Sequence, residues 1–532
     1  MHSRLLGVAL AAVTLLAAPA AHAADSRSVR LPPAAGSVSA ASAQTDTWLV
    51  GAQPGAATQQ IARRYGASAL QQGTAYSVAT KRARAFAGAL RRAGRLTYAE
   101  PNVDLNRKSA LDANPTGGPR QVIVPPGLAP PAPTASNSSI AIIDDRVDTS
   151  LPDLQANTAV VNPGPVLGPH GTMVASTAAG AFNGSGVFGI FPGAPILSIG
   201  MPLQATCADG ANGVIAAARA KARVINLSFG TPSDCGTLFD AVQKAYASGS
   251  LVVASAGNEG GAGNPVIYPA AYPHVLSVAA IDPTFNATEF SNRNTAVDVS
   301  APGVGIPVAI PLAFDADGTV DGITIAAGTS FSAPMVAGAA SWLATARPTL
   351  SNGQLADILR GSALDVGTPG YDPSTGFGLI RMPAALAFAT PGRDVLEPND
   401  GITFVNGTVF GRPDPFLWRG GGKRNLNGSA DQVEDPLDVY RIRLAGRSRV
   451  RIRVRPSSGD PDLFLFRGTA RSIRETNRIA ARSRRTGTKI DSITYRNASR
   501  TARTFYVAIS VSNATGTGVH ANYRLELQRL KR

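Results

Sequence analysis

The chain has 532 residues, of which 44% are hydrophobic and 16% are charged; this composition excludes a wholly disordered protein, and the length exceeds one ordinary core. We therefore expect two or three folded units. The formal net charge is +15. Residues 394–532 carry +13 of it, since they contain 26 Lys and Arg against 13 Asp and Glu. The positive charge therefore says nothing about the chemistry of the preceding residues.

The first 23 residues have the layout of a secretory signal peptide. Arg4 supplies a positive start, residues 5–18 form an apolar run, and Ala21-His22-Ala23 is a small-x-small cleavage site. The alternative is an N-terminal membrane anchor, although the run is short for a span. Because no later stretch is long and apolar enough to cross a membrane, we expect a secreted protein, either extracellular or in a periplasm or cell envelope, with no transmembrane segment in the mature chain.

Residues 45–106 predict a small α+β unit. Strands are expected at residues 47–50 and 95–103, and helices at residues 57–65 and 81–93. A Pro-rich stretch, residues 122–136, follows and is expected to be an extended, exposed linker.

Residues 140–390 alternate between strand and helix. Continuous apolar runs, typical of parallel strands buried on both faces, lie at residues 140–143, 224–227, 251–255 and 275–280. Helices are expected between them, for example at residues 210–221 and 236–247. The alternation predicts a doubly wound, mostly parallel α/β sheet, with its functional residues beyond the carboxyl ends of the strands.

From Asp394 the pattern changes to a period of two. Arg449, Arg451, Arg453 and Arg455 alternate with apolar residues, which predicts strands of a β-sandwich with one positive face. The chain has two cysteines, Cys207 and Cys235, which in an oxidising compartment form either one disulfide or two free buried thiols.

Four polar residues stand where the predicted α/β sheet would hold a functional site. Asp144 ends an apolar strand, where a carboxylate needs a partner, and His170 opens a helix in the segment HGTMVAS. Ser330 lies in GTSFSAPMVAG at a helix start, whose positive potential favours an oxyanion, and the amide of Asn258 in ASAGNEG is a further donor. The other histidine of this part, His274, is expected to be a surface turn residue.

These segments resemble a known enzyme family. IAIIDD, HGTMVAS, VINLSFG, ASAGNEG, VDVSAPG and GTSFSAPMVAG occur in the order found in subtilisin-like serine proteases, over residues 136–392. The order Asp, His, Ser also differs from chymotrypsin and from α/β-hydrolases, and Gly-Thr-Ser-Phe-Ser is not their nucleophile elbow. The resemblance implies a serine endopeptidase in which Asp144 orients His170, His170 takes the proton of Ser330, and Asn258 stabilises the oxyanion.

The resemblance also implies a specificity pocket and raises the question of a metal. Ile267 stands where many relatives have a glycine at the pocket floor, so we expect a shallow pocket for small or medium apolar side chains. No cofactor is implied for the chemistry; Asp153 and Asn183 match positions of a family calcium site, but the loop carrying Asn183 is one residue short. The expected pocket walls are Ser228, Phe229, Gly230, Ala256 and Gly257.

The flanking units resemble modules of secreted proteases. Residues 45–104, which have LTYAEPN near their end, look like an inhibitory propeptide that is removed by the enzyme itself; the alternative is an unrelated small domain. We place the propeptide at residues 24–110, the cut between Asn106 and Ser136, and the linker at residues 111–135. Residues 394–532 are similar to the bacterial pre-peptidase C-terminal domain, and their arginines are expected either to bind acidic envelope polymers or to form a solvated strand face.

Two features favour a different class of protein. The family's usual Asp-Thr-Gly is replaced by Asp144-Asp145-Arg146, and positive charge is concentrated in the last unit, as in a non-catalytic surface-binding protein. The intact Asp144, His170, Asn258 and Ser330 favour the protease. A nuclease is disfavoured, because the basic part has neither interleaved aromatic residues nor a metal cluster.

Overall fold

The computed structural model describes residues 44–531 apart from 71–72, 104, 106–109, 112–118, 135, 137, 185, 393, 395, 432–436, 474 and 512–519. The predicted signal peptide therefore lies outside the described residues, as do parts of the predicted propeptide and linker. Among the residues that are described, no helix is both long and apolar enough to cross a bilayer.

The N-terminal unit is a four-stranded antiparallel sheet covered by two helices. Its strands lie in the order β2-β3-β1-β4, and α3 packs the ring of Phe86 edge-on against Tyr76 of β3. This is the α+β unit that the sequence predicts. The elements are β1 (Gln44–Ala52), α2 (Ala56–Tyr65), β2 (Ser68–Leu70), β3 (Ala75–Ala79), α3 (Thr80–Arg92) and β4 (Leu96–Val103).

The central unit is built on a seven-stranded parallel sheet in the order β12-β11-β10-β9-β6-β8-β7. Its strands are β6 (Ile140–Asp144), β7 (Thr158–Val160), β8 (Ile196–Gly200), β9 (Val224–Leu227), β10 (Leu251–Ser255), β11 (Val275–Ile281) and β12 (Val299–Pro302). Its helices are α4 (Pro152–Gln155), α5 (His170–Ala179), α6 (Cys207–Arg219), α7 (Gly236–Ala247), α8 (Thr329–Ala346), α9 (Asn352–Gly361) and α10 (Met382–Ala387).

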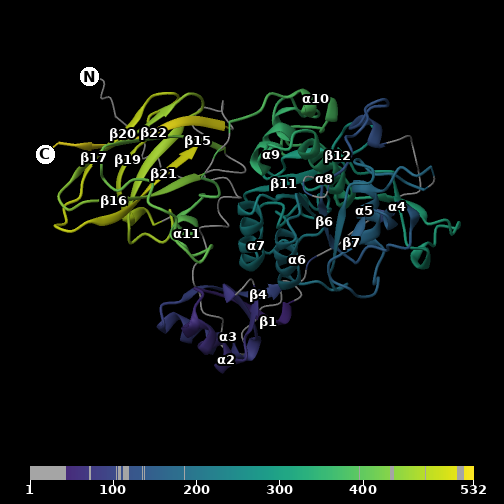
Figure 1. Cartoon of the computed structure of the whole chain (residues 1–532), viewed down its shortest axis with the longest axis horizontal. Helices are drawn as coiled ribbons and strands as arrows, with labels where there is room; N and C mark the ends of the chain where they lie inside the picture. Colours follow the sequence, from purple (N-terminus) through teal and green to yellow (C-terminus); the bar gives the residue numbers. More distant parts are fainter. Residues whose placement is uncertain are drawn as a thin grey trace, which may run out of the picture.

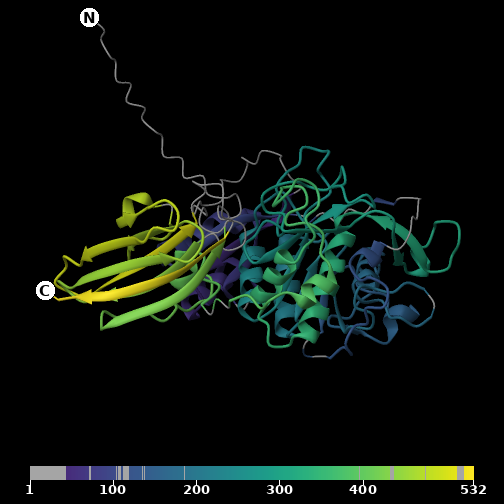
Figure 2. The same cartoon turned by 90° about the horizontal axis from the view of Figure 1, so that it is seen from above.

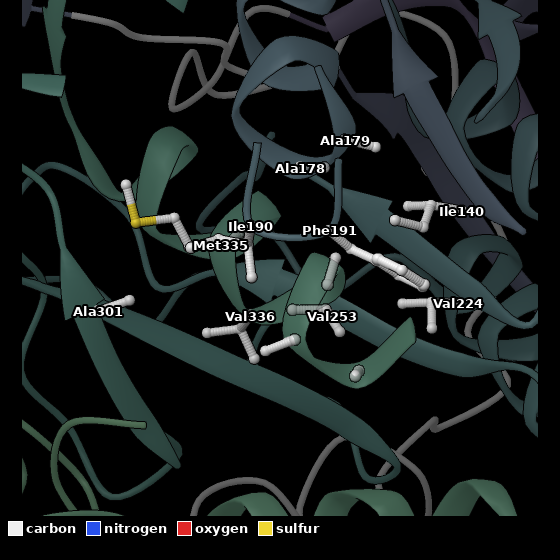
Figure 3. Packing of buried hydrophobic residues seen from close by; sticks show 14 of the residues in the cluster. Ile140, Ala178, Ala179, Ile190, Phe191, Val224, Val253, Ala301, Met335 and Val336 are labelled. Carbon is white, nitrogen blue, oxygen red and sulfur yellow. The ribbon is translucent and has the colours of Figure 1, made fainter. Parts of the chain in front are cut away.

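Helices cover both faces of this sheet, as the alternation of strands and helices predicts. Alternate residues of β6 face opposite ways: Ile140 and Ile142 join the core under α5 and α8, which Figure 3 shows from close by, whereas Ala141 and Ile143 join the core under α6 and α7. A small antiparallel sheet, β13-β14-β5, lies beside it, from β5 (Ala110–Leu111), β13 (Ile306–Ala309) and β14 (Ile323–Ala327).

The expected exposed linker is wrong at its first residues. After a short 3-10 turn, Pro119–Val122, the side chains of Ile123 and Val124 are buried in the core beneath α5 and α8. The Ile123 carbonyl accepts a hydrogen bond from the Met382 N–H at 2.9 Å. Two adjacent apolar side chains therefore anchor this segment, and only the Pro-rich residues after them run over the surface.

The C-terminal unit is a sandwich of two four-stranded antiparallel sheets, β15-β22-β17-β20 and β16-β21-β18-β19, which confirms the change to a period of two. Figures 1 and 2 show it at one end of the long axis. The elements are α11 (Ile402–Val405), β15 (Lys423–Asp431), β16 (Leu437–Leu444), β17 (Arg449–Pro456), β18 (Pro461–Arg467), a 3-10 turn (Thr476–Arg478), β19 (Ile479–Ser483), β20 (Asp491–Arg496), β21 (Arg503–Val511) and β22 (His520–Leu530).

The sandwich is attached to the central unit by aromatic packing. The ring of Phe404, from α11, lies edge-on to Phe239 of α7 with 5.8 Å between ring centres. Phe404 and Val409 belong to the same buried cluster as the inner face of α7. The three units therefore meet around α6 and α7 (Figure 1).

The cysteines are free thiols, so the disulfide alternative is not what the structure contains. Cys207 begins α6 and Cys235 precedes α7, and both side chains are buried. Burial and a hydrogen bond with Cys207 raise the pKa of the Cys235 thiol well above its usual value. The Cys235 thiol also donates to Glu100 Oε1 at 3.9 Å.

Candidate active site

Asp144 and His170 are brought together by the end of one strand and the start of one helix. Asp144 is the last residue of β6 and is fully buried, and His170 is the first residue of α5. The Nδ1 atom of His170 lies 2.9 Å from each carboxylate oxygen of Asp144. The Asp145 N–H also donates to that carboxylate at 2.7 Å, so the buried charge is paired and hydrogen-bonded.

The residue after the histidine has to be a glycine for this contact to form. A Cβ atom on Gly171 would lie 1.9 Å from the backbone oxygen of Asp145 and 3.2 Å from the Cβ of Asp144. The glycine therefore lets α5 begin against the end of β6, and this close approach brings the imidazole to the carboxylate. In the sequence His170-Gly171-Thr172, the glycine is thus needed for steric reasons and the histidine for the chemistry.

Ser330 lies in the first turn of α8 and is held there by a neighbouring motif. Pro334 has no N–H, so it cannot make the helix hydrogen bond to the Ser330 carbonyl. The Ser228 hydroxyl donates to that carbonyl instead, at 2.8 Å, while the Ser330 Oγ lies 3.3 Å from the Ser228 carbonyl oxygen. The next side chain, Phe331, has its ring centre 5.9 Å from that of His170, so the first turn of α8 packs against the imidazole.

The amide of Asn258 is fixed by its oxygen. Asn258 Oδ1 accepts hydrogen bonds from the Thr329 N–H at 2.9 Å and from the Thr329 hydroxyl at 2.8 Å. This leaves the amide NH2 group as the end that can donate to a substrate, beside Ser330. A side-chain N–H and the helix N-terminus are the donor types that stabilise an oxyanion.

A small pocket of about 20 Å³ adjoins Ser330 and is nearly filled by Ile267. A Cβ on Gly230 would lie 2.3 Å from Ile267 Cγ2, and one on Gly257 would lie 2.6 Å from Ile267 Cγ1. Both glycines are therefore needed to make room for this side chain. The lining residues are Ser228, Phe229, Gly230, Ser255, Gly257, Asn258, Glu259, Ile267, Thr329 and Ser330; the expected wall residue Ala256 is buried but does not line the pocket.

The sequence analysis missed three of these lining residues: Ser255, Glu259 and Thr329. Thr329 is the residue that holds Asn258, and Glu259 accepts a hydrogen bond from the Asn258 N–H at 2.9 Å. Glu259 and Thr329 stand directly beside Asn258 and Ser330 in the motifs ASAGNEG and GTSFSAP, and this was the available signal. Ser255 and Thr329 carry no titratable group, so a search for candidate acids and bases passes over them.

The arrangement around Asp153 does not fit a calcium ion. Calcium needs several oxygen ligands, but the Asp153 carboxylate accepts hydrogen bonds from two N–H donors, Asn183 Nδ2 at 2.9 Å and the Val187 N–H at 2.9 Å. Gly186 lies so close that a Cβ would be 2.1 Å from Asp153 Oδ2. Each carboxylate oxygen of Asp153 thus accepts a hydrogen bond from an N–H donor.

His274 is not the surface residue that the sequence analysis expected. It is buried, its Nδ1 lies 2.9 Å from Gln243 Oε1, and its Nε2 lies 3.2 Å from a carboxylate oxygen of Glu397. Burial raises the pKa of the nearby Asp400 and Asp438 carboxyls well above the usual range. The oxygen-rich groups that could hold a metal among the described residues are His274, Glu397 and Asp400, and Asp394, Glu397 and Asp438.

Comparison with known proteins places this site in a family context. Residues 135–378 match the model of the subtilase family. The chain is 36% identical to subtilisin E of Bacillus subtilis (strain 168) over 272 residues, which cover 49% of this chain and 68% of that protein. It is 35% identical to the subtilisin of Bacillus pumilus over 272 residues, covering 49% of this chain and 94% of that protein.

Similarity to one protein extends beyond the central unit. Fervidolysin of Fervidobacterium pennivorans is 30% identical over 322 residues, covering 53% of this chain and 45% of that protein. Its crystal structure, described as that of a keratinolytic enzyme related to subtilisin, superimposes with a TM-score of 0.56 at 19% identity, over 88% of this chain and 92% of that one. The structural match establishes a shared fold.

Proposed function

The chain belongs to the subtilase family and is a serine-type endopeptidase, and from that premise we propose that Asp144, His170 and Ser330 are its catalytic triad. The observation that carries this assignment is the contact of both Asp144 oxygens with His170 Nδ1 at 2.9 Å. That contact fixes the ring so that Nε2 is the nitrogen able to take a proton. Proteins and peptides are the substrates, and the family's catalysis needs no cofactor.

The proposed reaction has two steps, acylation of Ser330 and hydrolysis of the acyl-enzyme, and each of these groups acts in both. His170 Nε2 takes the proton of the Ser330 hydroxyl as its oxygen attacks the peptide carbonyl, and the imidazolium is stabilised by Asp144. The Asn258 NH2 group and the Ser330 N–H stabilise the tetrahedral oxyanion. His170 then protonates the leaving amine as the C–N bond breaks. In the second step His170 takes a proton from water as the water attacks the acyl carbonyl, and it returns this proton to Ser330 Oγ as the acyl–oxygen bond breaks.

We propose that the substrate residue before the cut bond is small. The side chain of Ile267 occupies the space between Gly230 and Gly257, so the remaining pocket accepts little more than Ala or Ser. The sequence analysis expected small or medium apolar side chains, and the present proposal narrows this preference to the small ones. Aromatic and long basic side chains would have to displace Ile267.

We also propose that the N-terminal unit is an inhibitory propeptide. Its Glu100 accepts hydrogen bonds from the N–H groups of Gly236 at 2.7 Å and Thr237 at 2.9 Å, so a carboxylate caps the N-terminus of α7. Asn102 Oδ1 accepts from the Ala208 N–H in α6 at 3.2 Å. These contacts join the unit to two helices of the enzyme and support both inhibition and assisted folding.

The proposed cut lies between Asn106 and Ala110, at the start of the range expected from the sequence. The Leu105 N–H donates to the Ala205 carbonyl at 2.8 Å, and its side chain is buried in the enzyme. Beyond the gap, Ala110 and Leu111 pair with Ala327 and Ala326 of β14, the strand that leads to Ser330. The chain is thus bound to the enzyme before and after the proposed cut.

Export and the identity of the last unit are the remaining parts of the proposal. We propose that residues 1–23 direct secretion and are removed, and that residues 394–532 are a pre-peptidase C-terminal domain. The sandwich topology and the period-two strands support the second assignment.

The test is the intact mass of the exported protein, measured for the wild type, for Ser330→Ala and for the control Ser332→Ala. Ser332 lies in the same helix turn, but its hydroxyl donates to Pro302 O at 3.1 Å and has no role in the proposed reaction. We expect the wild type and the control to lose the N-terminal unit, and Ser330→Ala to keep it. If Ser330→Ala is trimmed as the wild type is, maturation by this serine is wrong; if the wild type stays full length and inert on peptides, a surface-binding protein is the better description.

A further inference from the structure

One outer sheet face of the C-terminal sandwich carries six arginines. The residues between the arginines of β17, Val450, Ile452 and Val454, are fully buried, so Arg449, Arg451, Arg453 and Arg455 all point to the outside. Across the strand pairs, Arg496 of β20 lies opposite Arg449, and Arg524 of β22 lies opposite Arg455. We call the six the arginine face: Arg449, Arg451, Arg453, Arg455, Arg496 and Arg524.

Little negative charge balances this face among the described residues. Glu526 is the acidic residue that shares it, and it pairs with Arg455 at 2.8 Å. The other residues opposite the central arginines are neutral: Thr494 and Gln528 flank Arg451, and Ser492 lies opposite Arg453. Like charges in adjacent strands repel one another, so such a face is stabilised when an anion lies over it.

The face ends at a basic cavity. A cavity of about 570 Å³ lies where β17 begins and β22 ends, and it contains Arg449 of the arginine face. Among the described residues that line it, four are positive and none is acidic: Lys423, Arg449, Arg529 and Lys531, with Gly422, Gly446, Ser448, Gln528 and Leu530. A row of arginines leading into a basic cavity has the geometry of a site for a chain that carries repeated negative charges.

We propose that the arginine face binds a linear acidic polysaccharide, with the end of the polymer in the basic cavity. Alternate residues of a strand are ~7 Å apart, so the four arginines of β17 extend over ~20 Å, and neighbouring strands add a second row ~4.8 Å away. An extended polymer with one carboxylate or sulfate on each sugar can therefore meet successive guanidinium groups. This function is separate from proteolysis and does not depend on the triad.

The surroundings of the face favour a polysaccharide over the two other common polyanions. Nucleic-acid strands are bound by stacking on exposed aromatic rings, but Tyr495, the aromatic residue of β20, lies opposite the buried Val450 and so faces inward. Anionic membranes are bound by basic groups together with inserted apolar side chains. Among the described residues, no large exposed hydrophobic side chain belongs to this sheet.

The experiment compares two variants that lose the same charge, in full-length Ser330→Ala protein so that no self-cleavage occurs. The face variant is Arg449→Gln/Arg451→Gln/Arg453→Gln. The control is Arg467→Gln/Arg471→Gln/Arg503→Gln, which removes three exposed arginines of the same sandwich at other places. Binding to alginate, which carries carboxylates, and to heparin, which carries sulfates, is measured against salt concentration.

We expect the parent protein and the control to bind at least one of the two polymers and the face variant to bind weakly. On the scale known for nucleic acids, each lost contact lowers the slope of log K against log salt by about 0.7–0.9, so the face variant should lose about 2 units. Alginate or heparin binding tells which anionic group is preferred. Equal losses in both variants, or tighter binding to single-stranded DNA or to anionic phospholipid vesicles, would overturn the proposal. Peptide hydrolysis by the face variant with Ser330 restored should equal that of the wild type, which keeps this outcome separate from the triad.

Discussion

Replacing Ile267 with alanine should widen the substrate preference of the enzyme. Ile267 is buried, and its two branches point to Gly230 and Gly257, where a Cβ would come within 2.3 Å and 2.6 Å of them. The side chain therefore fills the space that a larger substrate residue would need. Alanine removes these branches and leaves both glycines in place. The pocket then opens between Gly230 and Gly257, which have no side chains to fill it.

The magnitude follows from the apolar groups that the opened pocket can accept. One methylene more or less in a hydrophobic pocket changes kcat/KM by about 10–200-fold. We therefore expect the ratio of kcat/KM for Phe to that for Ala at the residue before the cut bond to rise by at least about 10-fold. Ile267→Val, which removes a single methyl group, is the matched control and should give a smaller rise.

The assay is steady-state hydrolysis of peptide substrates that differ only in that residue: Ala, Leu and Phe. The melting temperature of each variant is measured in parallel, because Ile→Ala in a filled site costs about 2–5 kcal/mol if the surroundings do not relax. A wild-type preference for Phe, or an unchanged Phe-to-Ala ratio in a folded Ile267→Ala enzyme, would show that this side chain does not limit the pocket.

Four further outcomes follow from particular contacts. Thr329→Val should keep the backbone N–H bond to Asn258 Oδ1, lose the hydroxyl bond and lower kcat by less than Asn258→Ala, which should lower it by about 10²–10³, the loss measured for one oxyanion-hole donor in a subtilisin. A Thr329→Val effect on KM alone would contradict the positioning role. Glu100→Gln should weaken inhibition by the N-terminal unit by about 10-fold or more, since hydrogen bonds to a charged group contribute about 1.5–3 kcal/mol, and the inhibition constant of the isolated unit against mature enzyme measures this. Asp153→Asn should leave any calcium-induced rise in melting temperature unchanged, and a lost rise would restore the metal site. Burial raises the pKa of Asp462 to about 6, so between about pH 4 and pH 6 the folded protein holds a proton there that the unfolded chain has lost. The free energy of unfolding should therefore fall as the pH rises through this range. Denaturant unfolding of Asp462→Asn between pH 4 and pH 6 should lack that fall.

The parts of the fold that the sequence predicted are those set by local pattern. The helix expected at residues 236–247 is α7 as observed, and the apolar run at residues 140–143 is β6. Because β6 is a buried parallel strand, Asp144 had to fall at its carboxyl end, which is the edge where α/β proteins place their sites. The contact between Asp144 and His170 then follows from topology, although the assignment of roles rests on the family.

The features that the sequence analysis misjudged depend on partners far along the chain. His274 was expected at the surface, but it is covered by Gln243 and by Glu397, which is 123 residues away. Ile123 and Val124 stand beside a Pro-rich run, and only the core under α5 and α8 explains their burial. Asp153 has the identity of a metal ligand but not the surroundings, because two N–H donors take its oxygens. Periodicity and composition indicate that a side chain needs burial or a polar partner, but they do not identify the distant segment that provides it.

Ser330 illustrates why two distant motifs were needed together. Pro334 within five residues of the start of α8 is unfavourable for a helix taken alone, since it removes the N–H that would bond to the Ser330 carbonyl. The Ser228 hydroxyl supplies that bond from the end of another strand, 102 residues away. The same Ser228 lines the specificity pocket, so the segment that receives the substrate also fixes the backbone of the nucleophile. Proline inside a helix is thus tolerated at the proposed site of the chemistry. The hydrogen bond from Ser228 that compensates for it couples substrate binding to the position of Ser330.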